Sequence, residues 1–208
     1  MKRLTPILVL GASLSFSSLA NATGFDSDLA TTITGPIKVE VVVSEDLAHR
    51  AEHLPKKLSD RGSSRRLNAA FANNGKFGQR DIDRLVEEMN EELVEDFEKY
   101  GITISDDAPT VLRVTLEKVK PNRPTFKQLS EDTSLSFQSF SIGGAEITAE
   151  VIGAGDENLG TMEYDYYSNF NDIGSRGLTT WYDTNRTISR FSKRAAKKLA
   201  ALGASDQS

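Results

Sequence analysis

The stretch DIDRLVEEMNEELVEDFEKYG, residues 81–101, decides the fold because its helical periodicity is the clearest in the chain. Acidic residues occupy one side of this helix, which is typical of a solvent-exposed surface. Asp81 is placed to cap its start, and Gly101 is placed to end it in a left-handed conformation. Apolar residues recur at spacings of three and four and define a single buried face: Ile82, Leu85, Val86, Met89, Leu93, Phe97 and Tyr100.

A second amphipathic helix is predicted at the end of the chain, in TTWYDTNRTISRFSKRAAKKLAALG, residues 179–203. Thr180 and Asp183 have the spacing of a capping box at its start. Cations fill its C-terminal half, where they favour the helix dipole: Lys193, Arg194, Lys197 and Lys198. Its buried stripe consists of Ile188, Phe191, Ala195, Leu199 and Leu202.

The strands are indicated by alternation of apolar and polar residues. IKVEVVV at 37–43 and TVLRVTLEKV at 110–119 are predicted strands, and SLSFQSFSI, GGAEITAEV and GTMEYDYY are predicted to form a meander from residue 134 to residue 167. Gly143 and Gly144 precede a strand, whereas a phosphate-binding loop precedes a helix. We therefore interpret this pair as a bend or bulge with a positive φ at one glycine.

Two helices with one apolar stripe each require one sheet face to cover. The prediction is an α+β, two-layer sandwich, with a mixed, mostly antiparallel sheet of four to six strands covered on one face by two amphipathic helices. The predicted organisation is a single domain over 37–203, with a flexible lead-in at 23–36 and a polar tail at 204–208.

Residues 1–22 have the layout of a secretory signal peptide, with Lys2 and Arg3 ahead of an apolar run and Ala20-Asn21-Ala22 as the cleavage site. This predicts a periplasmic protein without a transmembrane helix in its mature chain, a location that allows peripheral membrane contact. The chain has no cysteine, which excludes disulfides, thiolate metal sites and an acylated N-terminal Cys. Its net charge of −5 argues against nucleic acid as a partner, because phosphate neutralisation needs a basic surface.

The motif HRAEH at 49–53 fits H-x-x-E-H, in which two histidines bind zinc and the glutamate activates water. His49, Glu52 and His53 are thus candidate metal-site residues of a zinc-dependent hydrolase. Against this, Pro55 would end the helix where such a site needs it to continue. Ordinary surface histidines and a non-catalytic metal site are the other interpretations, and no cofactor is expected.

Residues 174–181, GSRGLTTW, form a second candidate site. Arg176, Thr179 and Thr180 could bind an anion at the start of the last helix. Trp181, together with the tyrosines of the last strand, could form an aromatic platform for a glycan. The alternatives are a loop that leads into a capped helix and a tryptophan that covers the core.

The segment KPNRPTFKQL, residues 120–129, is a candidate partner-binding loop. Its candidate residues are Pro121, Arg123, Phe126 and Lys127, and loops on a rigid scaffold often carry function. A rigid connector is the alternative interpretation.

Three segments carry a family resemblance: PNRPTF, IGGAEI and TTWYDTNRTISRF. With them the chain resembles uncharacterised proteobacterial envelope proteins that contain domains of unknown function and are often lipoproteins. These proteins are similar in layout to the N-terminal α/β module of the translocation protein TolB and to small outer-membrane assembly lipoproteins. The resemblance covers residues 37–202 and implies no catalytic residues. The chain departs from the lipoprotein members because it has no Cys to acylate.

The leading hypothesis is an exported, non-catalytic module that binds an envelope protein or cell-wall component through a sheet edge or the loop at 120–134. A zinc-dependent hydrolase and a glycan-binding protein are the alternatives. The sequence favours a binding protein over an enzyme.

Overall fold

The computed structural model describes residues 24–57, 70–169 and 179–205. The predicted signal peptide and Arg176 lie outside these residues. In chain order the elements are β1 (Phe25–Ser27), β2 (Ile37–Val43), α1 (Glu45–Glu52), α2 (Phe71–Asn74), α3 (Gln79–Lys99), β3 (Thr110–Lys120), α4 (Phe126–Glu131), β4 (Gly144–Ile152), β5 (Asn158–Tyr167) and α5 (Tyr182–Ser205).

The strands form one five-stranded sheet in the order β1-β5-β4-β3-β2. Strand β2 runs parallel to β3, and the other neighbouring pairs are antiparallel. The predicted mixed, mostly antiparallel sheet is therefore confirmed. The parallel pair requires a long crossover, which α1, α2 and α3 provide between β2 and β3.

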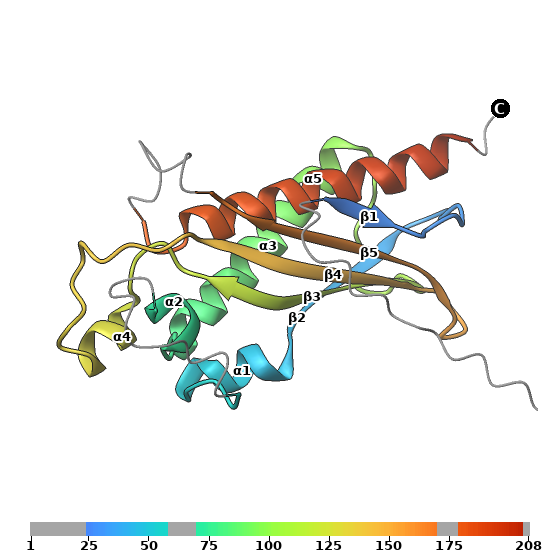
Figure 1. Cartoon of the computed structure of the whole chain (residues 1–208). Coiled ribbons are helices and arrows are strands. Elements are labelled where there is room, and N and C mark those ends of the chain that lie inside the picture. Colours follow the sequence, from blue (N-terminus) through green and yellow to red (C-terminus); the bar gives the residue numbers. More distant parts are fainter. Residues whose placement is uncertain (1–23, 58–69, 170–178, 206–208) are drawn as a thin grey trace, which may run out of the picture.

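Helices α3 and α5 pack side by side on the same face of the sheet (Figure 1). Every second residue of β4, from Ala145 to Val151, is buried against these helices, while the residues between them are more exposed. This alternation is the period of two that the strand geometry imposes. In the described part of the chain, no helix is both long and apolar enough to cross a membrane.

The end of α3 is formed as predicted. Gly101 has a φ of 74°, its N–H donates to Glu98, and the N–H of Ile102 donates to the carbonyl of Phe97. These two bonds make a Schellman motif, which satisfies carbonyls that the helix end would leave free. The start differs from the prediction, because α3 begins at Gln79 and Asp81 lies inside its first turn.

Two local predictions are wrong. Part of the expected flexible lead-in at 23–36 forms β1, which pairs with β5, and Leu29 is 1% exposed in the core. The expected strand at 134–142 is absent, because this segment follows α4 in turns and extended backbone before β4 begins. The side chains of Asp132 and Ser139 accept hydrogen bonds from the backbone N–H groups of Ser134 and Ser136, and such local bonds compete with strand pairing.

Gly144 opens β4 and has the predicted positive φ, 153°. A Cβ at this position would collide with the carbonyl oxygen of Tyr166 on the neighbouring strand. The expected bulge lies elsewhere, because the ladder between β3 and β4 shifts between Leu116 and Lys118. Glycine is therefore needed here because a neighbouring backbone approaches closely, and not because the strand pairing is irregular.

We expect Gly144→Val to lower the free energy of unfolding by about 3 kcal/mol or more, because it combines a strained φ with a collision in a packed region. Urea unfolding followed by circular dichroism measures this change. The matched control is Gly203→Ala in α5, where an added Cβ meets no atom within 4 Å. That change should raise stability by up to about 1 kcal/mol. Equal urea midpoints for wild type and Gly144→Val would refute the assignment.

Candidate binding site

A pocket of about 1130 Å³ lies at the end of the molecule where α3 and α5 begin, and we call it the end pocket. It brings together both loops that the sequence singled out, namely Arg123, Phe126 and Lys127 from one and Thr179, Thr180 and Trp181 from the other. Glu52 of the H-x-x-E-H motif also lines it. Pro121 is buried and is not among the lining residues.

Asn122 fastens residues 121–137, which we call the lip, to the start of α5. This side chain is fully buried; its Nδ2 donates to Oδ2 of Asp183 at 2.6 Å, and its Oδ1 accepts from the backbone N–H of Asp183 at 2.9 Å. Its backbone N–H donates to the carbonyl of Thr180, and its carbonyl accepts from the N–H of Ser141. Ser168 donates a further hydrogen bond to the Asp183 carboxylate.

Both predicted glycines support this attachment. A Cβ on Gly143 would overlap the side-chain amide of Asn122, so that only glycine lets the two segments approach. The hydroxyl of Thr184 donates to the carbonyls of Lys120 and Gly144, each at 3.1 Å. The predicted capping box of Thr180 and Asp183 is wrong, since Asp183 binds side chains of other elements.

Trp181 closes the floor of the end pocket. It is 5% exposed, packs edge-on against Phe77, and donates from Nε1 to Oδ1 of Asp81 at 2.7 Å. This hydrogen bond joins the first turn of α3 to the residue that precedes α5. Burial raises the pKa of Asp81, while the bond from Trp181 opposes that increase.

The lip presents an exposed aromatic pair. Phe126 is 78% exposed and Phe137 is 67% exposed, and their rings pack edge to face with centroids 5.9 Å apart. Helix α4, which carries Phe126, is held by a capping box between Thr125 and Gln128. Gln128 is buried and donates from Nε2 to the carbonyl of Phe71 at 2.7 Å. The aromatic pair is therefore exposed on a fixed support.

Four cations line the end pocket, against two carboxylates. Lys127 pairs with Glu52 at 3.4 Å, and this interaction raises the pKa of Lys127. Arg123 donates to the backbone carbonyls of Gln138 and Ser139, which directly follow the lip. Arg80 and Arg84 form no hydrogen bond or ion pair with any residue in the described ranges, and they lie one turn apart at the start of α3. Their charge is available to an anionic group.

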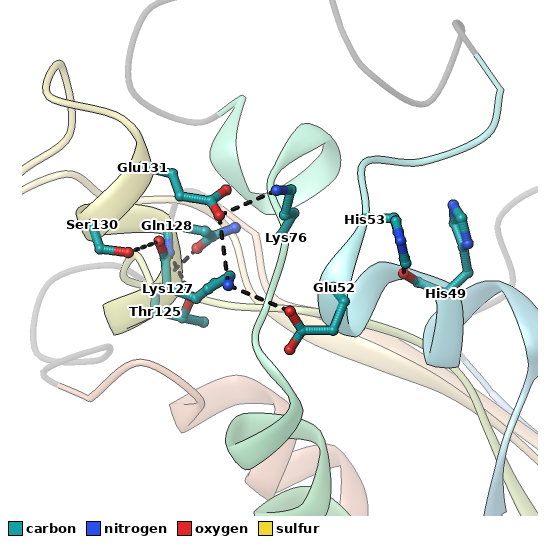
Figure 2. A network of polar contacts seen from close by, with 9 residues as sticks. All are labelled: His49, Glu52, His53, Lys76, Thr125, Lys127, Gln128, Ser130 and Glu131. Carbon is teal, nitrogen blue, oxygen red and sulfur yellow. Dashed lines mark hydrogen bonds and ion pairs between the residues drawn. The ribbon is translucent and has the colours of Figure 1, made fainter.

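The H-x-x-E-H residues do not converge. Figure 2 shows Glu52 turned toward Lys127, on the opposite side from His49 and His53. The two imidazoles stack on each other with centroids 4.6 Å apart, and His53 already has an extended backbone at the end of α1. Within residues 24–57, 70–169 and 179–205, no group of three His, Cys, Asp or Glu side chains could hold a metal ion. The zinc hypothesis therefore has no geometric support in this part of the chain.

Two of the aromatic side chains considered for glycan binding are buried, and the other two have a cation packed against the ring. Trp181 and Tyr164 are 5% and 4% exposed, as expected for residues that complete the core. Cations lie over the rings of Tyr166 and Tyr167 at 4.7 and 4.5 Å from their centroids.

The sequence did not identify Asn122, Asp81 and Phe137 as site residues, although a signal for Asn122 was present. Asn122 belongs to PNRPTF, and its partners Gly143 and Asp183 belong to IGGAEI and TTWYDTNRTISRF. The three segments that carried the family resemblance thus meet at one buried point. No local pattern marked Asp81 or Phe137 as part of a pocket.

No protein-family model and no curated protein matches the chain. Two similar solved structures are PelC dodecamers from Paraburkholderia phytofirmans. One carries a leucine-to-methionine substitution; it is 12% identical, has a TM-score of 0.39, and the match covers 86% of this chain and 98% of that chain. The other is 10% identical with a TM-score of 0.37, and the match covers 86% and 97% of the two chains. Likeness at this level assigns neither a family nor a function.

We expect Asn122→Ala to lower the free energy of unfolding by about 3 kcal/mol, because it removes a donor to a buried carboxylate and the acceptor of a buried N–H. Asn185→Ala is the matched control, since Asn185 lines the same pocket and its Oδ1 makes no hydrogen bond with any residue that the structure describes. This control should change stability by no more than about 1 kcal/mol. Urea unfolding measures both variants. Equal decreases in the free energy of unfolding would show that Asn122 does not attach the lip to α5.

The raised pKa of Asp81 predicts a pH dependence. The native protein holds the Asp81 proton more tightly than the unfolded chain, whose pKa lies near the ordinary value of 3.8. The contribution of Asp81 to the free energy of unfolding is therefore fully present below the unfolded-state pKa. It decreases as the pH rises through the raised pKa of the native state. Asp81→Asn removes the titrating group, and with it the loss of stability at higher pH, while its side-chain oxygen still accepts the hydrogen bond from Trp181. Its stability relative to wild type should increase from pH 3 to pH 7, as measured by urea unfolding; a constant difference would contradict the assignment.

Proposed function

We propose that this chain is an exported, periplasmic, non-catalytic protein that acts as a binding or assembly module for another envelope protein. The predicted secretory signal and the resemblance to proteobacterial envelope proteins support the location. The observation that carries the proposal is the end pocket, in which the exposed Phe126 and Phe137 lie beside Arg80 and Arg84, which form no hydrogen bond or ion pair with any described residue.

Two large aromatic side chains exposed together are unusual on the surface of a protein without partners, and they mark interaction sites. Aromatic residues and arginine are also the residues that contribute most to protein interfaces. The capping box and the buried Gln128 hold α4 in place, so that little ordering would oppose association.

The partner segment that fits this surface contains an apolar or aromatic side chain next to a carboxylate. The apolar group would pack on the Phe126 and Phe137 rings, and the carboxylate would pair with Arg80 or Arg84. Bidentate pairing of guanidinium with carboxylate gives geometric specificity as well as affinity.

Photo-crosslinking in cells tests the proposal. A photoreactive phenylalanine replaces Phe126 in one variant, Phe137 in a second, and Val94 in a control; Val94 is 41% exposed on α3 and does not line the end pocket. Mass spectrometry should recover the same envelope protein from the first two variants and not from the control. Recovery should fall at least tenfold when Arg80→Glu and Arg84→Glu are added, because the charge of the pocket is reversed.

Equal recovery from the Val94 control would indicate non-specific capture, and an absence of any product from positions 126 and 137 would refute docking at the end pocket. Zinc analysis of the purified protein separates the hydrolase alternative. One bound zinc per chain that is lost in His49→Ala would overturn the non-catalytic assignment.

A further inference from the structure

Helix α5 carries a row of cations along one face. After Asp183 the helix contains no acidic residue. At about 100° per residue, the cations fall within an arc of about 140° and extend over roughly 18 Å of the helix axis. We call this row the α5 stripe: Arg186, Arg190, Lys193, Arg194, Lys197 and Lys198.

No residue of the α5 stripe forms a hydrogen bond or ion pair with the described part of the chain. The guanidinium groups of Arg190 and Arg194 lie over the rings of Tyr166 and Tyr164, at 4.7 and 4.9 Å from the ring centroids. This packing fixes the direction of both side chains and leaves the donors at their edges unused. Lys193 and Lys197 are exposed.

The helix dipole does not explain the α5 stripe. Its effect falls off within the last turn, whereas Arg186 and Arg190 lie in the first half of α5. Like charges four residues apart also destabilise a helix, and Arg186, Arg190 and Arg194 repeat that spacing. The acidic residues of α3 do not compensate, because the side chains of Arg190 and Arg194 are directed toward β5. The chain thus keeps a costly cationic row although its net charge is −5.

One exposed aromatic residue continues the row. Tyr182 is 39% exposed and lies one turn before Arg186 on the same face of α5. No other large apolar side chain of α5 is exposed, so the stripe has no apolar anchor for insertion into a bilayer. An aromatic ring in line with evenly spaced cations suits a polymer that alternates sugar faces with anionic groups.

We propose that the α5 stripe binds an acidic polysaccharide. Its carboxylates pair with successive cations, which repeat about every 6 Å along the helix, and one sugar ring packs on Tyr182. This site is separate from the end pocket and does not depend on the function proposed for that pocket. Figure 1 shows that α5 runs along the sheet, where it contacts β4 and β5, so the stripe follows the long direction of the sheet.

Calorimetric titration with polygalacturonate tests the proposal on the full mature chain. Binding should be detectable at about 50 mM salt and at least tenfold weaker at about 200 mM, because several cations release counterions. Lys193→Glu with Lys197→Glu should weaken binding at least tenfold without a change in melting temperature, since both side chains are exposed. The matched control is Lys56→Glu with Lys57→Glu, which changes the net charge equally at exposed positions outside the stripe. This control should bind as wild type does.

Tyr182→Ala identifies the class of polymer. It should weaken binding of polygalacturonate several-fold and leave binding of polyglutamate unchanged, because polyglutamate has carboxylates but no sugar ring. An equal effect on both polymers, equal loss in the Lys56 and Lys57 control, or tighter binding to phosphatidylglycerol vesicles than to polygalacturonate would each overturn the proposal. The variants Arg80→Glu and Arg84→Glu should not affect polysaccharide binding, which keeps the two sites distinguishable.

Discussion

The buried hydrogen bonds between Asn122 and Asp183 are the constraint on which this end of the molecule depends. A carboxylate with little solvent contact is costly unless donors approach it. Asn122 and Ser168 both donate to Oδ2 of Asp183, while its buried Oδ1 has no hydrogen-bond partner among the described residues. The requirement is mutual, because Asn122 is itself fully buried. The two hydrogen bonds between Asn122 and Asp183 hold the lip against the first turn of α5 and thereby set the wall of the end pocket.

The glycine pair before β4 belongs to the same constraint. Gly143 leaves room for the Asn122 amide, and Gly144 leaves room for the carbonyl of Tyr166. A buried polar network of this kind favours one arrangement of the two segments, because moving them apart would leave the Asn122 amide and Oδ2 of Asp183 without their partners as well. The structure therefore places its strictest steric requirements next to the surface that we propose for binding.

Charge is separated between the two helices that cover the sheet. Helix α3 exposes carboxylates along its outer side and α5 exposes the cationic stripe, while their apolar faces share one core. Packing explains the shared core, since each helix needs a sheet face to bury its stripe. Packing explains only part of the separation, because Arg190 and Arg194 pack over Tyr166 and Tyr164, whereas Lys193 and Lys197 are exposed. This contrast is the reason to consider the α5 stripe as a functional surface.

The sequence by itself determined the two long helices, strands β2 to β5 and the left-handed glycine after α3, because hydrophobic period and backbone geometry are local properties. Only the tertiary structure decided that the lip, Trp181 and Glu52 line one pocket, that His49 and His53 lie apart from Glu52, and that β1 joins the sheet. These outcomes depend on contacts between residues far apart in the chain. Asn122 and Asp183, for example, are separated by 61 positions, and no local pattern records that they meet.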